Sequence, residues 1–288
     1  MSDHGFRVFK AITYIDQNLF AQIDLESIAS AGAFSPFHFH RVFTSLMGMT
    51  VNEYVRKRRL SEAARRLIDT DQDILDLALE CQYESQEAFT RAFKKAYDMA
   101  PGQLRKMKKS MEVSRSLTLD EINALIKGDA VKPEVIKQKA KRLVGIAKAY
   151  GDYDFQEAHD QWDQFAARWS ELKPTDENIV YGIRLPSHPL VNNPAKNGYV
   201  YLAGIEVGQD FALPTGMTEV ILPAGNYAKF THKGHLADSG DTARKIWNVW
   251  MPESGLKILD GLSIEAYGPK FDRESANSEF DILVPIHD

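Results

Sequence analysis

The sequence has a single cysteine, Cys81, among its 288 residues. One cysteine excludes an intramolecular disulfide and a cysteine-based zinc site, and it predicts a cytoplasmic protein. No stretch approaches the roughly 18 consecutive apolar residues of a membrane-spanning helix, and the first residues lack the charged-then-apolar layout of a signal peptide. Phosphate-loop, dinucleotide-binding and Gly-x-Ser-x-Gly motifs are also absent. These absences argue against a secreted or membrane-spanning protein, and we expect no cofactor.

The composition is typical of a folded globular chain. Hydrophobic residues make up 44% and charged residues 26% of the sequence, which is enough apolar material for a core. At about 100 to 200 residues per domain, the length predicts two domains. The charge differs between the halves, because residues 1–109 carry a net charge of +2 and residues 110–288 carry −7. We therefore expect the two halves to bind different kinds of partner.

The first half contains two similar helical segments that follow one another. In the first segment, Asp24 is a good N-cap, and Ser35 followed by Pro36 is a specific signal for the start of a second helix. Ser85 takes the same capping position in the second segment. A repeat of this kind predicts two copies of one supersecondary unit. The apolar stripes of the two second helices lie 50 positions apart and consist of Phe39, Val42, Phe43 and Leu46 and of Phe89, Ala92, Phe93 and Ala96.

A short helix, a tight turn and a second helix form the layout of a helix-turn-helix, whose second helix enters the major groove of DNA. Polar side chains opposite the apolar stripe can reach base edges or phosphates. The same pattern is also typical of a merely solvated helix face, but its duplication favours groove reading. The candidate DNA-binding residues are Phe37, His40, Arg41 and Thr44 in the first helix and Gln86, Glu87, Thr90, Arg91 and Lys94 in the second.

A basic amphipathic helix is predicted between the two units, over residues 54–67. Leu60, Ala63, Ala64 and Leu67 form its apolar stripe, and six basic residues accompany a single acid. Such a cluster can simply solubilise a helix, but the excess of positive charge favours contact with phosphates. A rigid helix could also hold the two reading helices roughly 34 Å apart, the spacing of successive major grooves on one face of DNA.

The second half changes from helical to strand periodicity. Strands are predicted at 142–147, 179–185, 199–207, 217–222, 226–232, 262–267 and 280–286, with helices at 155–172 and 238–250. This order predicts an α+β domain of two pseudo-repeated β-α-β-β units. We therefore expect a multidomain chain: an all-α domain with two helix-turn-helix units over residues 1–109, a linker with one short helix over 110–132, and the α+β domain over 133–288.

Residues 8–105 resemble the DNA-binding domain of AraC/XylS-type transcription regulators. The matching motifs are LESIASAGAFSPFHFHRVF from Leu25 and ILDLALECQYESQEAFTRAFKKAYDMAPGQLR from Ile74. The resemblance implies that bases are read by Phe37, His40 and Arg41 on the first of these helices. On the second, it implies base reading by Gln86, Glu87, Thr90 and Arg91. Three positions depart from the family: Gln82 and Asp98 replace usual glycines, and Glu87 replaces a commoner neutral residue. Glu87 could favour a cytosine amino group, so the preferred DNA sequence is expected to differ from that of relatives.

Residues 133–288 resemble the GyrI-like effector-binding domain of bacterial regulators. The motifs that carry the resemblance are ILPAGNYA from Ile221, IWNVWMPESG from Ile246, IEAY from Ile264 and ILVPI from Ile282. In relatives this domain forms a cleft that binds bulky, often cationic aromatic molecules above a buried glutamate. Glu265 matches that glutamate, and a carboxylate among aromatic rings attracts a cation by charge and by ring quadrupole.

The candidate walls of this cleft are Tyr181, Tyr227, Trp162, Trp169 and Trp247, and we take the first three as the effector-binding candidates beside Glu265. Trp162 also lies on a helical apolar stripe, as do Trp169 and Trp247, and such tryptophans are more often packing residues. Without the family resemblance, the strand pattern around Glu265 does not tell which of its faces is buried.

Two histidine pairs, His38 with His40 and His232 with His235, are weak metal candidates. Side chains two apart on a helix point in different directions, and the second pair has no evident third ligand, so we expect no metal.

Three classes of function follow from these features. We favour a regulator that binds double-stranded DNA and senses a small, aromatic or cationic effector, and we expect no enzymatic activity. A rival is a GyrI-like hydrolase in which Glu265 acts as the base, which needs a second polar group beside it. The other rival is a C-terminal interaction module that binds a protein such as gyrase or RNA polymerase and no ligand.

Overall fold

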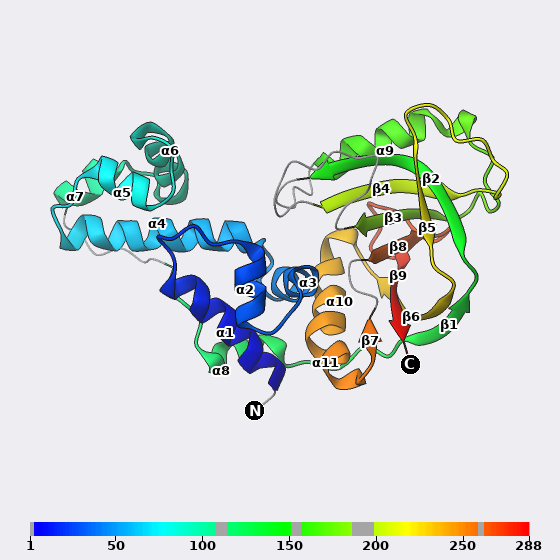
Figure 1. Cartoon of the computed structure of the whole chain (residues 1–288), viewed down its shortest axis with the longest axis horizontal. Coiled ribbons are helices and arrows are strands. Elements are labelled where there is room, and N and C mark those ends of the chain that lie inside the picture. Colours follow the sequence, from blue (N-terminus) through cyan, green and yellow to red (C-terminus); the bar gives the residue numbers. More distant parts are fainter. Residues whose placement is uncertain (1–2, 108–113, 151–156, 186–198, 259–261, 288) are drawn as a thin grey trace. The chain divides into compact units, whose positions relative to one another are not determined.

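The computed structural model describes residues 3–107, 114–150, 157–185, 199–258 and 262–287 (Figure 1). The chain divides into two compact units, Met1–Lys127 and Gly128–Asp288. Within the described ranges, no helix combines the length and apolar character needed to span a membrane.

The first unit is all-α, as predicted. Asp24 caps its second helix by accepting a 2.9 Å hydrogen bond from the Ser27 amide. Ser35 and Ser85 cap the two predicted reading helices in the same way, each through its hydroxyl. The helices are α1 (Asp3–Gln17), α2 (Leu25–Ala31), α3 (Pro36–Met47), α4 (Val51–Asp69), α5 (Ile74–Glu80), α6 (Gln86–Tyr97), α7 (Pro101–Met107) and α8 (Leu119–Ile126).

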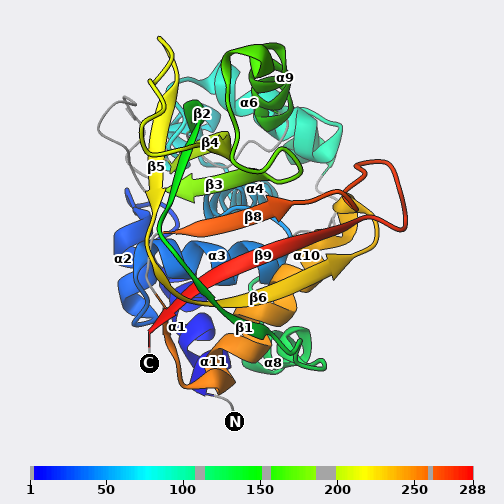
Figure 2. The ribbon, with the colours of Figure 1, turned by 90° about the vertical axis from the view of Figure 1, so that its right-hand side faces the viewer.

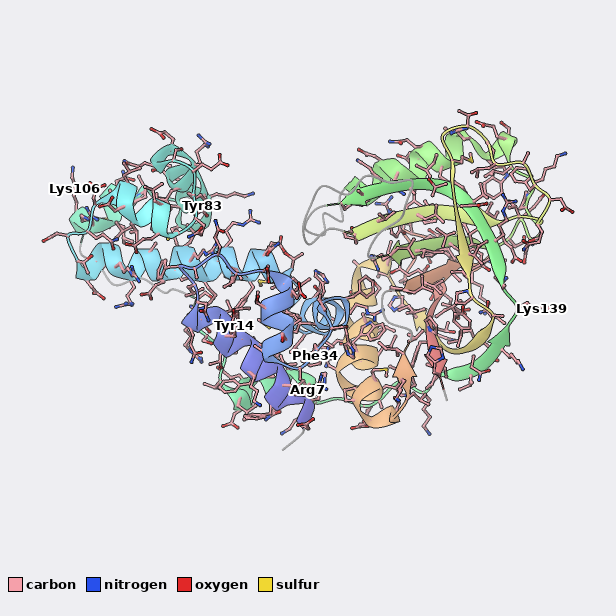
Figure 3. The ribbon with its side chains drawn as sticks, in the orientation of Figure 1. Arg7, Tyr14, Phe34, Tyr83, Lys106 and Lys139 are labelled. Carbon is pink, nitrogen blue, oxygen red and sulfur yellow. The ribbon has the colours of Figure 1, made fainter. Side chains whose placement is uncertain are left out.

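The sequence repeat is also a repeat of packing. Phe39 and Phe43 are fully buried in the first helix-turn-helix with ring centroids 5.5 Å apart. Phe89 and Phe93 take the same places in the second, 5.6 Å apart. Tyr83, labelled in Figure 3, adds a third ring at 5.5 Å from Phe89. The predicted apolar stripes are confirmed except at the last position of the second helix-turn-helix, because Ala96 is exposed.

Residues with left-handed backbone conformation lie in the turns of both helix-turn-helix copies and directly after their second helices. Gly48 follows α3 with φ 65°, and its counterpart Asp98 follows α6 with φ 54°. Ala33 and Gln82, in the turns before α3 and α6, have φ of 56° and 66°. Residues with a Cβ atom adopt this conformation at a cost. Gln82 offsets part of that cost, since its side-chain amide donates a 2.9 Å hydrogen bond to the Phe20 carbonyl.

The turn before α3 is held from α1. Arg7 donates from Nε to the Gly32 carbonyl at 3.0 Å, and its guanidinium carbon lies 4.1 Å from the centroid of the Phe34 ring (Figure 3). This contact combines a charged hydrogen bond with a cation–π interaction, so it fixes the turn that sets the direction of α3.

Helix α8 packs on the first unit through α1. Ile122 is fully buried, and a Cβ atom at Gly5 would lie 2.2 Å from the Asn123 side chain, so the two helices approach closely there. Thr118 and Glu121 form a capping box at its start. Residues 114–126, which the sequence assigns to the linker, are thus part of the packed first unit.

The second unit contains one antiparallel sheet in the order β1-β6-β9-β8-β3-β4-β2-β5, with β7 paired to β9 (Figure 2). The order is symmetric about the central pair of β3 and β8, which confirms the α+β class and its two pseudo-repeats. The strands are β1 (Glu134–Gln138), β2 (Lys141–Tyr150), β3 (Val180–Leu185), β4 (Tyr199–Glu206), β5 (Thr218–Leu222), β6 (Gly225–Lys233), β7 (Lys257–Ile258), β8 (Ser263–Tyr267) and β9 (Glu279–His287).

Helix α9 (Glu157–Ala167) belongs to the first repeat, and α10 (Ser239–Arg244), a π-helical segment (Lys245–Trp250) and α11 (Met251–Ser254) belong to the second. Successive side chains along a strand point alternately into two apolar clusters, one on each face of the sheet. The sequence did not predict β1, whose residues are mostly exposed and polar.

Candidate functional site

The face of α6 opposite its apolar stripe is open to solvent. Gln86, Glu87, Arg91 and Lys94 are exposed, and Thr90 is partly exposed. Hydrogen bonds from its own backbone amide and from the Ser85 hydroxyl lower the pKa of Glu87, so its carboxylate stays charged at the helix start. All five predicted residues of this helix are thus arranged along one accessible surface.

The four predicted residues of α3 contact one another in pairs. The Arg41 guanidinium carbon lies 4.5 Å from the Phe37 ring centroid, and the Thr44 hydroxyl lies 3.2 Å from Nδ1 of His40. Phe37 and Thr44 are partly exposed, whereas His40 and Arg41 are buried, at 6% and 8% exposure. The assignment of these side chains to base reading stays a prediction, and for His40 and Arg41 it requires that they become accessible.

The basic residues of α4 have partners that the sequence does not reveal. Arg58 pairs with Asp16 at 2.8 Å, and Arg59 donates to the Leu19 carbonyl at 2.6 Å. Arg65 and Arg66 pair with nearby acids, including Glu62. Arg58, Arg59 and Arg66 thus contact other helices or loops of the helical unit, whereas Arg65 is exposed and pairs within α4 itself. Arg56 and Lys57 are also exposed, and contact of the cluster with phosphate stays a prediction.

A cavity of about 870 Å³ lies on one face of the sheet in the second unit. It contains two of the four predicted effector residues, Glu265 and Trp162. Its volume is in the range of cavities that hold drug-sized molecules. The lining residues are Trp162, Val180, Arg184, Tyr199, Tyr201, His235, Leu236, Ala237, Ser239, Glu265, Tyr267, Phe271, Arg273 and Glu274.

Glu265 lies in the middle of the sheet, on β8, in register with Gly182 on β3. Its Oε1 accepts a 3.2 Å hydrogen bond from Arg184, and its Oε2 accepts a 2.8 Å hydrogen bond from the Tyr267 hydroxyl. A Cβ atom at position 182 would lie 2.2 Å from the Tyr201 hydroxyl, so glycine leaves room for this cluster. The carboxylate is thus held by two donors and reached from the cavity.

Aromatic rings surround this carboxylate. Trp162 donates from Nε1 to the Tyr201 hydroxyl at 3.2 Å and meets the Tyr267 ring edge-on at 5.6 Å. Phe271 lies 4.5 Å from Tyr267. Burial, and then the negative charge of Glu265, raise the pKa of both Tyr201 and Tyr267. Both phenols therefore stay protonated and can donate hydrogen bonds.

The structure does not bring Tyr181 and Tyr227 to this cavity. Both are buried in the apolar cluster on the other face of the sheet. Tyr181 precedes Gly182 on β3, and neighbouring residues of a strand point to opposite faces. Its hydroxyl accepts a 3.2 Å hydrogen bond from Lys141, and the Tyr227 hydroxyl donates to the Pro223 carbonyl at 2.6 Å. These tyrosines are core residues.

Arg184, Tyr201 and Tyr267 are the site residues that sequence reasoning missed. The alternation of side chains along β8 places Tyr267 on the same face as Glu265, and the same rule applied to β3 groups Arg184 with Gly182. Once Glu265 was assigned to the cavity, Tyr267 could have followed from the sequence, whereas Arg184 and Tyr201 needed the pairing of strands.

Of the other tryptophans, Trp247 is buried in packing and Trp169 is 37% exposed. His232 is also buried, with its ring nitrogens within hydrogen-bonding distance of the Thr242 hydroxyl and the His235 carbonyl. Among the residues that the structure describes, no three His, Cys, Asp or Glu side chains are grouped to hold a metal ion.

Two family models match the chain. A helix-turn-helix domain model matches residues 28–107, and a model of the GyrI-like small molecule binding domain matches residues 132–287. The transcriptional regulator Rob of Salmonella typhimurium is 25% identical over 286 residues, which cover 96% of each chain. The uncharacterized HTH-type transcriptional regulator YbfP of Bacillus subtilis is 52% identical over 98 residues, which cover 34% of this chain and 33% of YbfP.

A solved structure of SAV2435 bound to tetraphenylphosphonium is similar to this chain, with a TM-score of 0.42 and 16% identity. The similarity covers 54% of this chain and 94% of the SAV2435 chain. The GyrI-like model alone spans more than half of the sequence, and Rob, which is matched over nearly its whole length, is a transcriptional regulator. This chain therefore belongs to the AraC-type DNA-binding transcription regulators that carry a C-terminal GyrI-like small-molecule-binding domain.

Proposed function

We propose that the cavity around Glu265 binds an aromatic cation as the effector of this regulator. The observation that carries the proposal is a carboxylate that is 18% exposed at the cavity and surrounded by the rings of Trp162, Tyr201 and Tyr267. A cation gains charge attraction from such a carboxylate and quadrupole attraction from the rings, and both grow as water is displaced. The cavity volume suits a molecule of several rings.

Tetraphenylphosphonium is a suitable probe, because it is a permanent cation covered by aromatic rings. We expect the full-length chain to bind it in isothermal titration calorimetry, and Glu265→Gln to weaken binding about tenfold or more, since the substitution removes the charge and keeps the shape. Glu274→Gln is the matched control, because Glu274 also lines the cavity but is exposed. Equal affinities of the wild type and Glu265→Gln would refute the role of Glu265.

We also propose that α3 and α6 read bases in two major grooves. The exposed polar face of α6 supports this, and α4, with 19 residues, spans about 28 Å between the two helix-turn-helix units. The candidate reading residues are Phe37, His40, Arg41, Thr44, Gln86, Glu87, Thr90, Arg91 and Lys94. Selection from random duplex DNA by the full chain should yield an asymmetric site with two blocks about one helical turn apart. Failure to enrich any sequence would contradict the proposal.

We infer that the cavity binds its ligand without converting it. The structure does place a second polar group beside Glu265, which the hydrolase alternative requires, but both carboxylate oxygens accept hydrogen bonds from Arg184 and Tyr267. These two donors hold the carboxylate in place among aromatic rings, an arrangement that suits the binding of a charged ligand. Hydrolysis of an aromatic ester such as 4-nitrophenyl acetate by the wild type, lost in Glu265→Gln, would overturn this inference.

RNA polymerase is the protein partner that we propose beside DNA, because a regulator acts on transcription by altering how polymerase uses a promoter. Transcription in vitro from a promoter that carries the selected site, with and without tetraphenylphosphonium, tests this step. An unchanged transcript level with the regulator bound to its site would contradict it.

A further inference from the structure

His232 is a buried histidine to which the proposed function gives no role. It lies on β6, is 3% exposed, and contacts Phe280 of β9 with ring centroids 5.1 Å apart. Its Nε2 is 3.0 Å from the His235 carbonyl oxygen, and its Nδ1 is 2.9 Å from the Thr242 hydroxyl. Both ring nitrogens therefore have a partner, and both partners lie further along the chain.

The His235 carbonyl determines the tautomer of this ring. A carbonyl oxygen can only accept a hydrogen bond, so Nε2 carries the proton and donates it. In the neutral ring Nδ1 is then the acceptor, and the Thr242 hydroxyl donates to it. The imidazole is thus held in one orientation, and it joins β6 both to the segment directly after this strand and to α10.

The segment that His232 holds, residues 235–239, is a wall of the effector cavity and supplies four of its lining residues. The amide of Asp238 also donates to the His235 carbonyl, at 2.9 Å, and closes a single 3-10 turn over Leu236–Asp238. One such turn has little stability of its own. The hydrogen bond from His232 therefore attaches this wall segment to the sheet.

The same imidazole connects the wall segment to the carboxylate of the cavity. Phe280, which contacts His232, lies 5.2 Å from the Tyr267 ring, and the Tyr267 hydroxyl donates to Glu265. The wall segment and Glu265 are thus fixed to one group of packed rings. A cavity whose parts are fixed before the ligand arrives avoids the cost of ordering them on binding.

We infer that His232 is a positioning residue of the effector cavity: the hydrogen bond from its Nε2 to the His235 carbonyl holds the wall segment in the conformation that binds the effector. The inference rests on the proposed function, because it concerns the cavity proposed to bind the effector. Without this bond the wall segment adopts other conformations, and the apparent dissociation constant rises as the fraction of competent protein falls.

Two substitutions separate the two ring nitrogens. His232→Gln places an amide nitrogen near the position of Nε2, so it can still donate to the His235 carbonyl. His232→Asn has a shorter side chain, whose amide lies near the position of Nδ1 and reaches only the Thr242 hydroxyl. Both remove the ring and its contact with Phe280, so a difference between them reports the bond to His235.

The first readout is the binding of tetraphenylphosphonium to the full-length chain in calorimetry. We expect the dissociation constant of His232→Asn to exceed that of His232→Gln about threefold or more. Thr231→Val is the matched control, because Thr231 is next to His232 on β6, points to the other face and bonds to Asp281 at 2.6 Å. This control should bind as the wild type does. Equal affinities of the asparagine and glutamine variants would overturn the inference.

The second readout needs no ligand. Hydrogen–deuterium exchange, followed by mass spectrometry of peptides that cover residues 235–242, should be faster in His232→Asn than in His232→Gln. Exchange elsewhere in the second unit should be the same in the two variants. Equal exchange over residues 235–242 would contradict the inference, and so would a difference that extends over the whole unit, because it would show a general loss of stability.

These outcomes distinguish the inference from the proposed function. If the wild type binds tetraphenylphosphonium and both variants bind it equally well, the effector cavity stays in place and the role of His232 is refuted. If the wild type does not bind the probe, the proposed function fails. Exchange over residues 235–242 then decides whether His232 holds the wall segment.

Discussion

Asp98 offers a direct test of how backbone conformation limits the stability of the second helix-turn-helix. It follows α6 with φ 54° and ψ 17°, and its amide closes the helix on the Lys94 carbonyl. An L-residue in this region costs roughly 1 to 2 kcal/mol, and glycine avoids that cost but gains about 0.4 to 1 kcal/mol of freedom in the unfolded chain. The net expectation for Asp98→Gly is an increase of about 0.5 to 1 kcal/mol in the free energy of unfolding.

The rate at which the Cys81 thiol reacts measures the stability of the second helix-turn-helix, so no added label is needed. Cys81 is the single cysteine of the chain, it is 1% exposed in the core of the second helix-turn-helix, and burial raises its thiol pKa to about 12. The thiol therefore reacts only when this core opens. When opening and closing are fast, the rate follows the open population, so Asp98→Gly should slow modification by 5,5′-dithiobis(2-nitrobenzoic acid) about twofold to fivefold.

Asp98→Ala is the control, because it removes the carboxylate at the end of α6 and keeps the Cβ atom. It should slow the reaction less than the glycine variant, since the left-handed backbone remains strained. Equal slowing by alanine and glycine would show that the charge, and not the backbone, is responsible. No slowing by glycine would refute the assignment of strain to this position.

Three further perturbations follow from the geometry. Arg91→Ala should cost about 1 to 3 kcal/mol on the preferred DNA site and relax the choice of one base pair, as measured by titration of single-base variants; equal weakening on every sequence would exclude base reading. Arg56→Ala should reduce the slope of log affinity against log salt by about 1, and Arg65→Ala by less, because Arg65 is already paired with two acids; identical slopes would contradict this division. Gly182→Ala should abolish tetraphenylphosphonium binding while DNA affinity persists, because the new Cβ atom would lie 2.2 Å from the Tyr201 hydroxyl; unchanged binding would refute the fit at the cavity floor.

The local signals in the first half were strong enough to predict its helices. Asp24, Ser35 and Ser85 are caps in the structure as in the sequence, because an N-cap bonds to an amide only two or three residues away. The arginines of α4 could not be interpreted in the same way. Arg58 pairs with Asp16, which lies 42 positions earlier and on another helix. Such partners depend on how helices pack, and periodicity within one helix carries no information about them.

In the second half seven strands were predictable, β1 and β7 were not, and the faces of the strands were not. The alternation of apolar and polar residues identifies a strand but does not tell which of its faces is the core. A shift of one residue moves each side chain from the core face to the cavity face. Tyr181, next to Gly182, is such a case, since the chemistry of a tyrosine suits either face. Glu265 came from a family motif rather than from the pattern. Arg184 could not be assigned because its pairing with Glu265 requires the register of β3 against β8.

The strand order of the second unit means that the two repeats depend on each other to form the cavity. The strand that precedes each repeat pairs with the other repeat, since β1 joins β6 and β5 joins β2. Neither half can complete its own sheet, and a half on its own would expose a strand edge able to capture another chain. Arg184 belongs to the first repeat and Glu265 to the second, so their ion pair joins the two repeats. The cavity around Glu265 is therefore built from both repeats, and it exists only when both are folded together.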